Sequence, residues 1–576
     1  MAISDLLVNS KVVFRRIGQV LLVLFAIWCG FAEPPATTWL PDWWYAGLAL
    51  ISAVALVVWD LRAMASYGLY IFPHGTGTFR PQLQQGVGRF LSLIELASRF
   101  RWRSGGIYVG RPLPQHRLFG LLPWNLQVGP PDDRHMLTIA GARSGKGTAV
   151  IIPNLLHYPG SVLVIDPKGE LAQITASRRG KGSARVIHSL GQDVFILDPE
   201  DIVEGHPRAC WNPLAELDVS SPHIWGRVTK VSLALVPTQV GAQEFFANHA
   251  RDFLTALIMH VLLTEPPEHQ NLIYIRRLVT QGDQEVFDLV AEECHNNGTE
   301  VPYQDAFEAM LGYMVHNHAH SGKISGIAQQ LVGLAEETRS GVIGTLVEQT
   351  GFLDHESMEK TLQRSDFSLG DLKTRPTTIY ICLTGTSLAG PIAKVMSILL
   401  ELSVTRLEEI PGRPPHNVLF IMDEFYCLGR SEAIDRAMGL IAGYGLTLWP
   451  ILQHVGQLQK HYPATWDNFM RNCRAVQYFG DQSPEMLKQL EARIGDRVYR
   501  KKDGTEDRRP FLPFSELASN YFTRESRRQI VLFQQQPAAP LALTHYFEHE
   551  RLFPKTFYDD DPRKVQRSQY AAWHQP

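Results

Sequence analysis

A candidate phosphate-binding loop lies at residues 137–156, which read LTIAGARSGKGTAVIIPNLL. A short apolar stretch is followed by glycines around Lys146 and then by an apolar helical pattern. In loops of this layout, backbone N–H groups and the start of the helix surround phosphate oxygens, and the lysine adds a positive charge. The residues that would bind the phosphates are Gly141, Ala142, Arg143, Ser144, Gly145, Lys146, Gly147 and Thr148.

The loop departs from the pattern G-x-x-x-x-G-K-[S/T] at two positions. Ala140 stands where the first glycine is expected, and Gly147 stands where a magnesium-binding hydroxyl is expected. Thr148 follows one position late, and one residue rotates a side chain by about 100° around a helix. Thr148 would therefore reach a magnesium ion only if the turn shifts; otherwise water and a downstream carboxylate must hold the ion. Taken alone, the stretch also fits a glycine-rich turn without ligand.

Two adjacent carboxylates end a second apolar stretch, VLFIMDEF, at residues 418–425. This is the Walker B arrangement, in which Asp423 would hold Mg²⁺ through water and Glu424 would act as general base on the attacking water. An apolar strand that ends in Asp-Glu is common by itself. Its combination with the loop around Lys146 favours a working site for ATP and Mg²⁺.

A third stretch, GLTLWPILQ at residues 445–453, ends in Gln453. The side-chain amide could sense the γ-phosphate from the edge of a neighbouring strand, so Gln453 joins Glu424 as a catalytic candidate. Pro450 lies inside the stretch and has no N–H to give to a central strand. We therefore expect a bulge at Pro450 or a shorter strand.

Short apolar runs recur along the body of the chain and predict a parallel β-sheet. They are apolar on both faces, as expected when helices cover both sides of a sheet. Several end in Asp or Gly, which brings polar groups to the carboxyl edge where α/β proteins bind ligands. The predicted strands are HMLTIA (135–140), SVLVID (161–166), DVFILD (193–198), TTIYICL (377–383), NVLFIMD (417–423) and AVQYFG (475–480). The expected fold class is therefore α/β.

Between these strands, residues 205–365 lose the strand pattern and become helical in character. The stretch NHARDFLTALIMHVLLTE (248–265) places apolar residues at helical spacing. We predict an all-α insertion that interrupts the α/β domain. Within it, His316 and His320 could share a helix face at i, i+4. Because no carboxylate stands at ligand spacing, a solvated helix face is favoured over a metal site.

Two apolar stretches at the amino terminus, 17–33 and 43–59, lie at the lower edge of the length that spans a hydrocarbon core. The flanking basic residues are Lys11, Arg15, Arg16 and Arg62. By the positive-inside rule both ends of this pair face the cytoplasm, which predicts a transmembrane hairpin. The alternative is two buried core helices. The connector that follows either touches anionic headgroups or is a solvated linker.

Composition sets limits on the kind of protein this is. The chain has 576 residues, 45% of them hydrophobic, so an ordered protein with more than one domain is expected. A net charge of −3 argues against whole-chain affinity for nucleic acid, so any such contact must be a local patch or an assembled lumen. Six scattered cysteines without a C-x-x-C pair argue against a disulfide framework or a zinc ribbon.

Taken together, the motifs resemble the type IV coupling proteins, the TraG-like family of conjugation and type IV secretion ATPases. They occur in the order and approximate spacing of that family, from the amino-terminal hairpin to about residue 550. The motifs are DRHMLTIAGARSGKGTAVIIPNLL, SVLVIDPKGEL, CWNPL, VLFIMDEFYCLGR, LQHVGQL and WDNFMRNCRAVQYFGD. A glycine after the loop lysine is usual in this family, which accounts for Gly147.

The resemblance implies a RecA-like P-loop nucleotide-binding domain with an inserted all-α domain, preceded by the transmembrane hairpin. The implied domains are 1–70 (hairpin), 71–134 (connector), 135–204 and 366–550 (two parts of the nucleotide-binding domain), 205–365 (all-α insertion) and 551–576 (tail). It also implies a homo-hexamer in the lipid of the bacterial inner membrane, with most of the chain cytoplasmic. The implied partners are type IV secretion channel components and the substrates handed to them, relaxosome-bound single-stranded DNA or effector proteins.

The resemblance also assigns roles at single positions. Residues 141–148 match Walker A, Asp423 and Glu424 match Walker B, and Gln453 matches the glutamine beyond it. Asp166 and Lys168, in DPKGE, match a strand-end motif near the nucleotide. A turn capped by the aspartate explains these two residues equally well.

One departure concerns the arginine finger that some members place shortly after Walker B. The corresponding stretch here reads GLIAGYGL and has no arginine. The candidates are Arg436, Arg471 and Arg474, the last two being preferred, and salt bridging on a helix face would account for each of them as well. Two other functions stay open: an FtsK-like DNA translocase, and a membrane docking receptor for secretion cargo that does not hydrolyse nucleotide.

Overall fold

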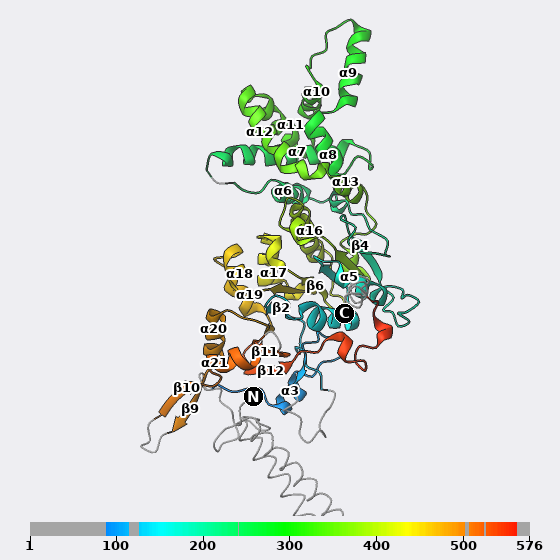
Figure 1. Cartoon of the computed structure of the whole chain (residues 1–576). Coiled ribbons are helices and arrows are strands. Elements are labelled where there is room, and N and C mark those ends of the chain that lie inside the picture. Colours follow the sequence, from blue (N-terminus) through cyan, green and yellow to red (C-terminus); the bar gives the residue numbers. More distant parts are fainter. Residues whose placement is uncertain (1–87, 114–125, 240, 501–505, 524–525, 561–576) are drawn as a thin grey trace, which may run out of the picture. The chain divides into compact units, whose positions relative to one another are not determined.

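The computed structural model describes residues 88–113, 126–239, 241–500, 506–523 and 526–560 (Figure 1). The predicted transmembrane hairpin, much of the connector and most of the carboxy-terminal tail lie outside these residues. Among the residues described, none of the helices has the length and apolar character needed to cross a membrane.

The chain divides into two compact units, and the described part of the first is centred on helix α3 (Leu93–Arg99). Ser92 and Glu95 form a reciprocal cap at its start. The N–H of Glu95 donates to Ser92 Oγ at 3.2 Å, and the N–H of Ser92 donates to Glu95 Oε2 at 2.9 Å. Two N–H groups that a helix start leaves unpaired are thereby satisfied.

The second unit is built on a ten-stranded sheet with the order β1-β12-β11-β8-β2-β7-β6-β3-β5-β4. From β8 to β4 all neighbours are parallel, while β11, β12 and β1 continue the sheet in antiparallel fashion. The strands are β1 (Arg111–Pro112), β2 (Met136–Ala140), β3 (Val162–Ile165), β4 (Asp193–Leu197), β5 (Thr377–Ile381), β6 (Val418–Met422), β7 (Leu446–Leu452), β8 (Ala475–Phe479), β11 (Arg528–Phe533) and β12 (Ala538–Ala542). A separate hairpin pairs β9 (Asp496–Arg500) with β10 (Glu506–Pro510). The expected α/β class is confirmed, and the antiparallel extension was not predicted.

The parallel strands are buried because they are apolar on both faces. Every residue of β2, β3, β5, β6, β7 and β8 is buried. The helices of the sheet region contact one another in two groups. In one group α4 contacts α5, and in the other α17 contacts both α16 and α19. The helices of the sheet region are α4 (Ile152–His157), α5 (Glu170–Arg179), α14 (Asp371–Thr374), α15 (Gly385–Leu388), α16 (Ala393–Glu409), α17 (Glu432–Leu440), α18 (Gly456–His461), α19 (Trp466–Asn472), α20 (Pro484–Ile494) and α21 (Phe514–Glu516).

The parallel register brings the polar strand ends to one edge of the sheet. Ile165 at the end of β3 pairs with Ile381 of β5 and with Met422 of β6. The next residues along β3 and β6 are Asp166 and Asp423. Because neighbouring parallel strands end together, these two carboxyl groups emerge side by side.

Strand β7 runs through Pro450 in continuous register with β6, so the predicted bulge is absent, while its bounds, Leu446–Leu452, make it shorter than the predicted 445–453. Pro450 pairs with Met422 of β6, and pairing with β2 starts one residue later, at Ile451. Before that point a side chain replaces the backbone partner: the N–H of Leu448 donates to His135 Nδ1 at 3.1 Å. The His135 side chain therefore accepts an N–H of β7 in the part of the strand, around the proline, where β7 does not pair with β2.

Between β4 and β5 the described chain is helical, as the periodicity predicted. The helices are α6 (Ile224–Leu235), α7 (Glu244–Thr264), α8 (Leu272–Gln281), α9 (Gln284–Asn297), α10 (Ala306–Val315), α11 (Ala319–Val332), α12 (Glu336–Thr350) and α13 (Glu356–Leu362). Their starts are fixed by polar caps: the side chains of Asn271, Asp283 and Asp305 each accept a backbone N–H from the first turn of α8, α9 and α10. In Figure 1, α7 lies among α8, α11 and α12, while α9 lies farther out beyond α10.

The expectation that His316 and His320 share a helix face was wrong. Helix α10 ends at Val315, so His316 is its C-cap. His320 and Ser321 have φ values of 51° and 61°, in the left-handed region, which breaks the helical path. Among the described residues, no group of three or more His, Cys, Asp or Glu side chains is arranged to hold a metal ion.

The fully buried Arg179 joins four segments of the chain around the sheet. Arg179 is fully buried, and burial lowers its pKa to about 10, so the guanidinium stays charged at neutral pH. Its nitrogens donate to Leu155 O, Tyr158 O, Gly160 O, Thr378 Oγ1 and Gln192 Oε1 at 2.6–2.9 Å. None of these acceptors is a carboxylate. The charge is instead stabilised by the carbonyl end of α4, where the helix dipole is negative.

Replacing Arg179 by methionine should lower the free energy of unfolding by roughly 3 kcal/mol or more, because buried carbonyls would lose their donors. Urea unfolding followed by circular dichroism measures the change. The control is Arg471→Met: Arg471 is 75% exposed and pairs with Asp467 one helical turn away. That variant should stay within about 0.5 kcal/mol of wild type. Equal effects of the two variants would contradict the structural role of Arg179.

His135 makes the stability of the sheet depend on pH. Burial lowers its pKa from 6.5 to about 4, and its Nε2 lies 3.2 Å from Ala437 O. The folded state therefore needs the neutral ring. This contribution is complete above pH 6.5 and is lost as the pH falls from 6.5 toward 4, because the unfolded chain takes up the proton first.

A His135→Gln variant keeps one acceptor and one donor but does not titrate. We expect wild type to lose up to about 2 kcal/mol relative to this variant between pH 7.5 and pH 5. Urea midpoints of both proteins at the two pH values measure the difference. A difference that does not change with pH would contradict the neutral, buried state of His135.

Candidate nucleotide site

The loop between β2 and the next helix has the shape of an anion-binding turn. Gly145 has φ 90° and ψ 21°, and Arg143 has φ 57°, so both adopt the left-handed region. The chain then enters a π-helical segment, η2 (Lys146–Ile151), which continues into α4. Within the described chain, the backbone N–H groups of Ser144, Gly145 and Lys146 donate to no protein acceptor. Such free donors at a helix start suit phosphate oxygens.

Close packing explains why the loop contains glycine at 141. A Cβ atom at Gly141 would lie 2.5 Å from the backbone oxygen of Asp481, closer than any normal contact. The loop is further tied by Ser144, whose Oγ donates to Gly141 O at 2.6 Å. The backbone of the loop is thus fixed by β8 and by its own side chains before any ligand binds.

Three of the predicted residues meet at the carboxyl edge of the sheet. Lys146 Nζ lies 2.9 Å from Glu424 Oε1, and Gln453 Nε2 donates to Glu424 Oε2 at 3.0 Å. They come from the ends of three adjacent strands, because β7 lies between β2 and β6. Lys146 is only 10% exposed and Glu424 24% exposed, so the cluster is partly shielded from water.

Glu424 is held in a strained backbone conformation. Its φ of 51° and ψ of 43° lie in the left-handed region, where a non-glycine residue costs on the order of 1 kcal/mol. Its N–H donates to Asp423 Oδ1 at 3.1 Å. The sharp reversal after β6 turns the Glu424 side chain toward Lys146 and Gln453.

The three carboxyl groups at this edge titrate differently. Burial acts to raise the pKa of Glu424, but the hydrogen bond and charge of Lys146 outweigh it and hold the pKa below its usual value. Burial raises the pKa of Asp423, and the neighbouring Glu424 charge adds to this. Burial raises the pKa of Asp166 to about 7, with a further contribution from Asp423. Glu424 is therefore the carboxylate that is ionised most readily.

Asp166 caps the turn that leads into α5. Its carboxyl oxygens accept the N–H of Ala172 at 2.9 Å and that of Lys168 at 3.4 Å. Lys168 contributes a positive charge that favours the ionised forms of Asp423 and Glu424. The capped turn is thus present, and it brings Lys168 close enough to the carboxyl edge of the sheet for its charge to act on Asp423 and Glu424.

Thr148 lies away from the cluster of Lys146, Glu424 and Gln453. Its Oγ1 is 2.8 Å from His545 Nδ1 and 3.4 Å from Gly145 O. His545 was missed by the sequence analysis because nothing in its neighbourhood resembles a motif and 397 positions separate it from Thr148. Only the folding of the chain after β12 brings it to the loop.

The three arginine-finger candidates all form ion pairs within the chain. Arg436 pairs with Glu401 at 3.2 Å, Arg471 with Asp467 at 2.7 Å, and Arg474 with Asp132 at 3.3 Å. None of these three pairs involves Glu424 or the loop. Arg471 is the most exposed of the three, at 75%.

The arrangement fits a nucleoside triphosphate with a divalent cation. Free N–H groups and a lysine suit phosphate oxygens, and adjacent carboxylates suit a hydrated Mg²⁺ ion. Gly147 adds no side chain that would obstruct the loop, since a Cβ atom there would meet only Leu171 at 4.0 Å. The residues present therefore fit both groups.

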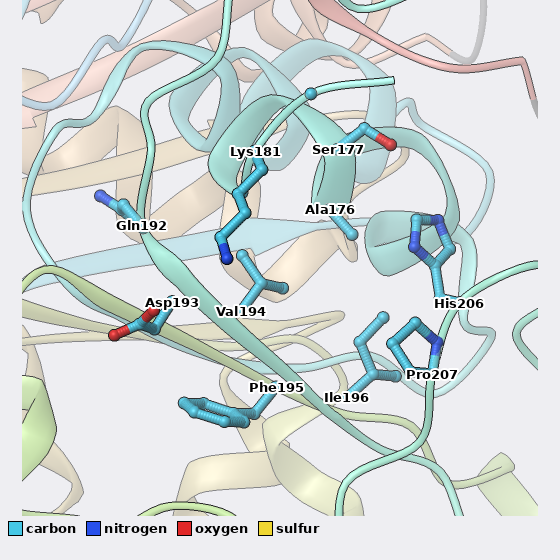
Figure 2. A pocket seen from close by; sticks show the side chains of 12 residues that line it. Ala176, Ser177, Lys181, Gln192, Asp193, Val194, Phe195, Ile196, His206 and Pro207 are labelled. Atoms are coloured by element: carbon cyan, nitrogen blue, oxygen red, sulfur yellow. The ribbon is translucent and has the colours of Figure 1, made fainter. Parts of the chain in front are cut away.

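A separate cavity of about 370 Å³ lies beside the edge strand β4 (Figure 2). It is lined by Ala176, Ser177, Gly180, Lys181, Gly182, Gln192, Asp193, Val194, Phe195, Ile196, His206 and Pro207. Figure 2 shows Lys181 and Val194 toward its middle, with His206 and Pro207 on one side. It shares no residue with the loop, Glu424 or Gln453.

Comparison with known proteins identifies the family. The model of the family described as type IV secretory system conjugative DNA transfer matches residues 103–551. Protein VirD4 of Agrobacterium fabrum is 26% identical over 508 residues, which cover 86% of this chain and 67% of that protein. Conjugal transfer protein TraG of Escherichia coli is 25% identical over 382 residues, 64% of this chain and 55% of that protein. The chain thus aligns with between about half and two thirds of the length of its curated relatives.

A solved structure shares the fold. The bacterial conjugative coupling protein TrwBdeltaN70, in a complex with sulphate, superposes with a TM-score of 0.56 at 16% identity, covering 81% of this chain and 96% of that one. Further structures of TrwB contain a non-hydrolysable ATP analogue, or ADP and Mg²⁺. With a family match over most of its length and this fold, the chain belongs to the type IV coupling proteins of conjugative DNA transfer.

Proposed function

We propose that this protein is a P-loop ATPase of the bacterial inner membrane that couples substrate recruitment to a type IV secretion channel. The observation that carries the proposal is the cluster of Lys146, Glu424 and Gln453 beside a loop with free N–H donors. Membership of the conjugative DNA transfer family supports it, as do the TrwB complexes with an ATP analogue and with ADP and Mg²⁺.

In the proposed reaction, residues 141–148 bind the phosphates of ATP through backbone N–H groups. Lys146 leaves Glu424 and turns to the β- and γ-phosphates. Once Lys146 has left, Glu424 loses the partner that holds its pKa down, and its carboxylate becomes a stronger base for the proton of the attacking water. Gln453 donates a hydrogen bond to the other carboxylate oxygen of Glu424 and so orients this base. In the proposed complex its side-chain amide also lies beside the γ-phosphate. A bound Mg²⁺ ion would neutralise charge on the phosphate oxygens.

For the metal we propose Asp423 and water as the ligating groups. Thr148 stays the alternative, but its hydroxyl is hydrogen-bonded to His545 and would have to leave that partner first. Asp423 lies beside Glu424 at the end of β6 and accepts only the Glu424 N–H among the hydrogen bonds of the described residues. It therefore retains lone pairs for a hydrated cation.

The proposal also covers the assembly of several chains and the substrates that they pass on. We expect a homo-hexamer, anchored by the amino-terminal hairpin, that passes single-stranded DNA or effector proteins to the channel. The helices α6–α13 are the proposed region of substrate recognition. They are connected to the sheet by contacts of α6 with α16, and by Lys394 of α16, whose Nζ donates to Gln349 O of α12 at 2.7 Å.

Lys146→Ala and Glu424→Gln should separate binding from hydrolysis. Lys146→Ala removes the charge on the phosphates, so nucleotide binding and hydrolysis should both be lost. Glu424→Gln should retain ATP binding while hydrolysis falls by about 100-fold or more, because the general base is removed. ATP binding by calorimetry and phosphate release are measured on the full-length protein in detergent, with and without single-stranded DNA.

The control variants are Lys460→Ala and Glu485→Gln, which change exposed charges outside the site. Both should hydrolyse ATP at the wild-type rate. Wild-type protein that binds secretion cargo but does not hydrolyse ATP would instead indicate a docking receptor. Hydrolysis that continues unchanged in Glu424→Gln would exclude Glu424 as the general base.

The Mg²⁺ dependence of hydrolysis tests the metal assignment. Asp423→Asn should raise the half-saturating Mg²⁺ concentration about tenfold or more, because it removes the charge behind the metal-bound water. Thr148→Ala should leave that concentration within about twofold of wild type, because the hydroxyl already binds His545. Loss of Mg²⁺-dependent turnover in Thr148→Ala, with rescue by Thr148→Ser, would assign the hydroxyl to the metal instead.

A further inference from the structure

A turn from the far end of the chain lies directly on the phosphate loop. It follows β12 and consists of His545 and η9 (Tyr546–Glu548), which contacts η2. The His545 Cε1 atom stands 2.7 Å from where a Cβ atom of Gly145 would be. His545 Nδ1 is also 2.8 Å from Thr148 Oγ1. The imidazole ring therefore forms one wall of the loop.

The turn is fixed in place by contacts that do not involve the loop. Arg111 Nε of β1 donates to the buried Thr544 Oγ1 at 3.1 Å. Arg527 pairs with Glu548 at 2.5 Å. Tyr546 is 7% exposed and packs edge-on against Tyr558, with ring centroids 4.7 Å apart. The position of the turn is thus set by the antiparallel edge of the sheet.

Two aromatic rings of this turn form an open stack. The His545 and Phe547 rings lie 5.4 Å apart with an angle of 21° between their planes. Phe547 is 55% exposed, the highest value among the exposed large aromatic side chains of the described residues. A large ring left open to water beside a polar loop is a ready surface for a flat ligand.

The stack and the carboxylate cluster contact different residues of the loop. Lys146 and Thr148 lie two positions apart in the π-helical segment η2, so their side chains leave it in different directions. Lys146 faces Glu424, and Thr148 faces His545. A nucleotide whose terminal phosphate lies at Glu424 would extend its nucleoside toward the His545 side of the loop.

We propose that His545 and Phe547 form the stacking surface for the purine base of the bound nucleotide. This inference rests on the proposed function, because it names the nucleoside end of the same site. It assigns the specificity for a nucleoside to the turn after β12, whereas the loop and the carboxylates handle the phosphates. Stacking recognises the face of either purine, so ATP and GTP should bind with similar affinity.

The test compares ATP with inorganic tripolyphosphate, which has the phosphates without the base. Binding of each to the full-length protein in detergent with Mg²⁺ is measured by calorimetry, without reference to hydrolysis. Phe547→Ala should weaken ATP binding about tenfold and leave tripolyphosphate binding within about twofold. His545→Gln, which keeps a partner for Thr148 but loses the ring, should act in the same direction.

The matched control is Phe245→Ala, since Phe245 is 46% exposed on α7 and lies outside the loop region. It should change neither affinity. Unchanged ATP binding in Phe547→Ala, or an equal loss for ATP and tripolyphosphate, would overturn the stacking role. If wild-type protein bound neither ligand, the proposed nucleotide site itself would fail, which is a different result from an unchanged ratio.

Discussion

The position of β7 between β2 and β6 is the constraint on which the site depends. Neighbouring strands lie about 4.8 Å apart, so the strand that leads into the loop and the strand that carries the acidic pair are about 10 Å apart. That gap is bridged by the long side chains of Lys146 and Glu424, with Gln453 rising from the strand between them. A direct β2–β6 pairing would leave no room for phosphates between the two groups.

Several energetically unfavourable features lie together at the carboxyl edge of the sheet. Glu424 and Arg143 adopt left-handed backbone conformations, and Asp166 and Asp423 are carboxyl groups with raised pKa values. Such features persist only where the surrounding structure is stable enough to enforce them. The buried strands supply that stability. Arg179 satisfies carbonyl groups between α4 and β3, and His135 accepts the N–H of Leu448 in β7.

The sequence predicts the parts of this structure that local chemistry determines. The parallel strands follow from apolar runs, and the loop and acidic pair follow from their motifs. Pro450 predicted a bulge that is absent, because the compensating acceptor is His135, a residue more than 300 positions away. The same holds for His545: its contact with Thr148 depends on where the antiparallel strands end. Side chains whose roles arise from long-range packing left no pattern that a single sequence reveals.

The order of strands in the sheet also has a consequence for synthesis of the protein. Strand β2 is made early, yet its partners are β7 and β8, and β4 pairs with β5 only after the helices α6–α13 have been made. At 5–20 residues per second, the roughly 335 residues from β2 to β8 take on the order of 20 to 70 seconds to emerge. During that time apolar strands stand without neighbours and are open to aggregation. The strand order of the finished sheet thus sets how long its first strands wait for their neighbours during synthesis.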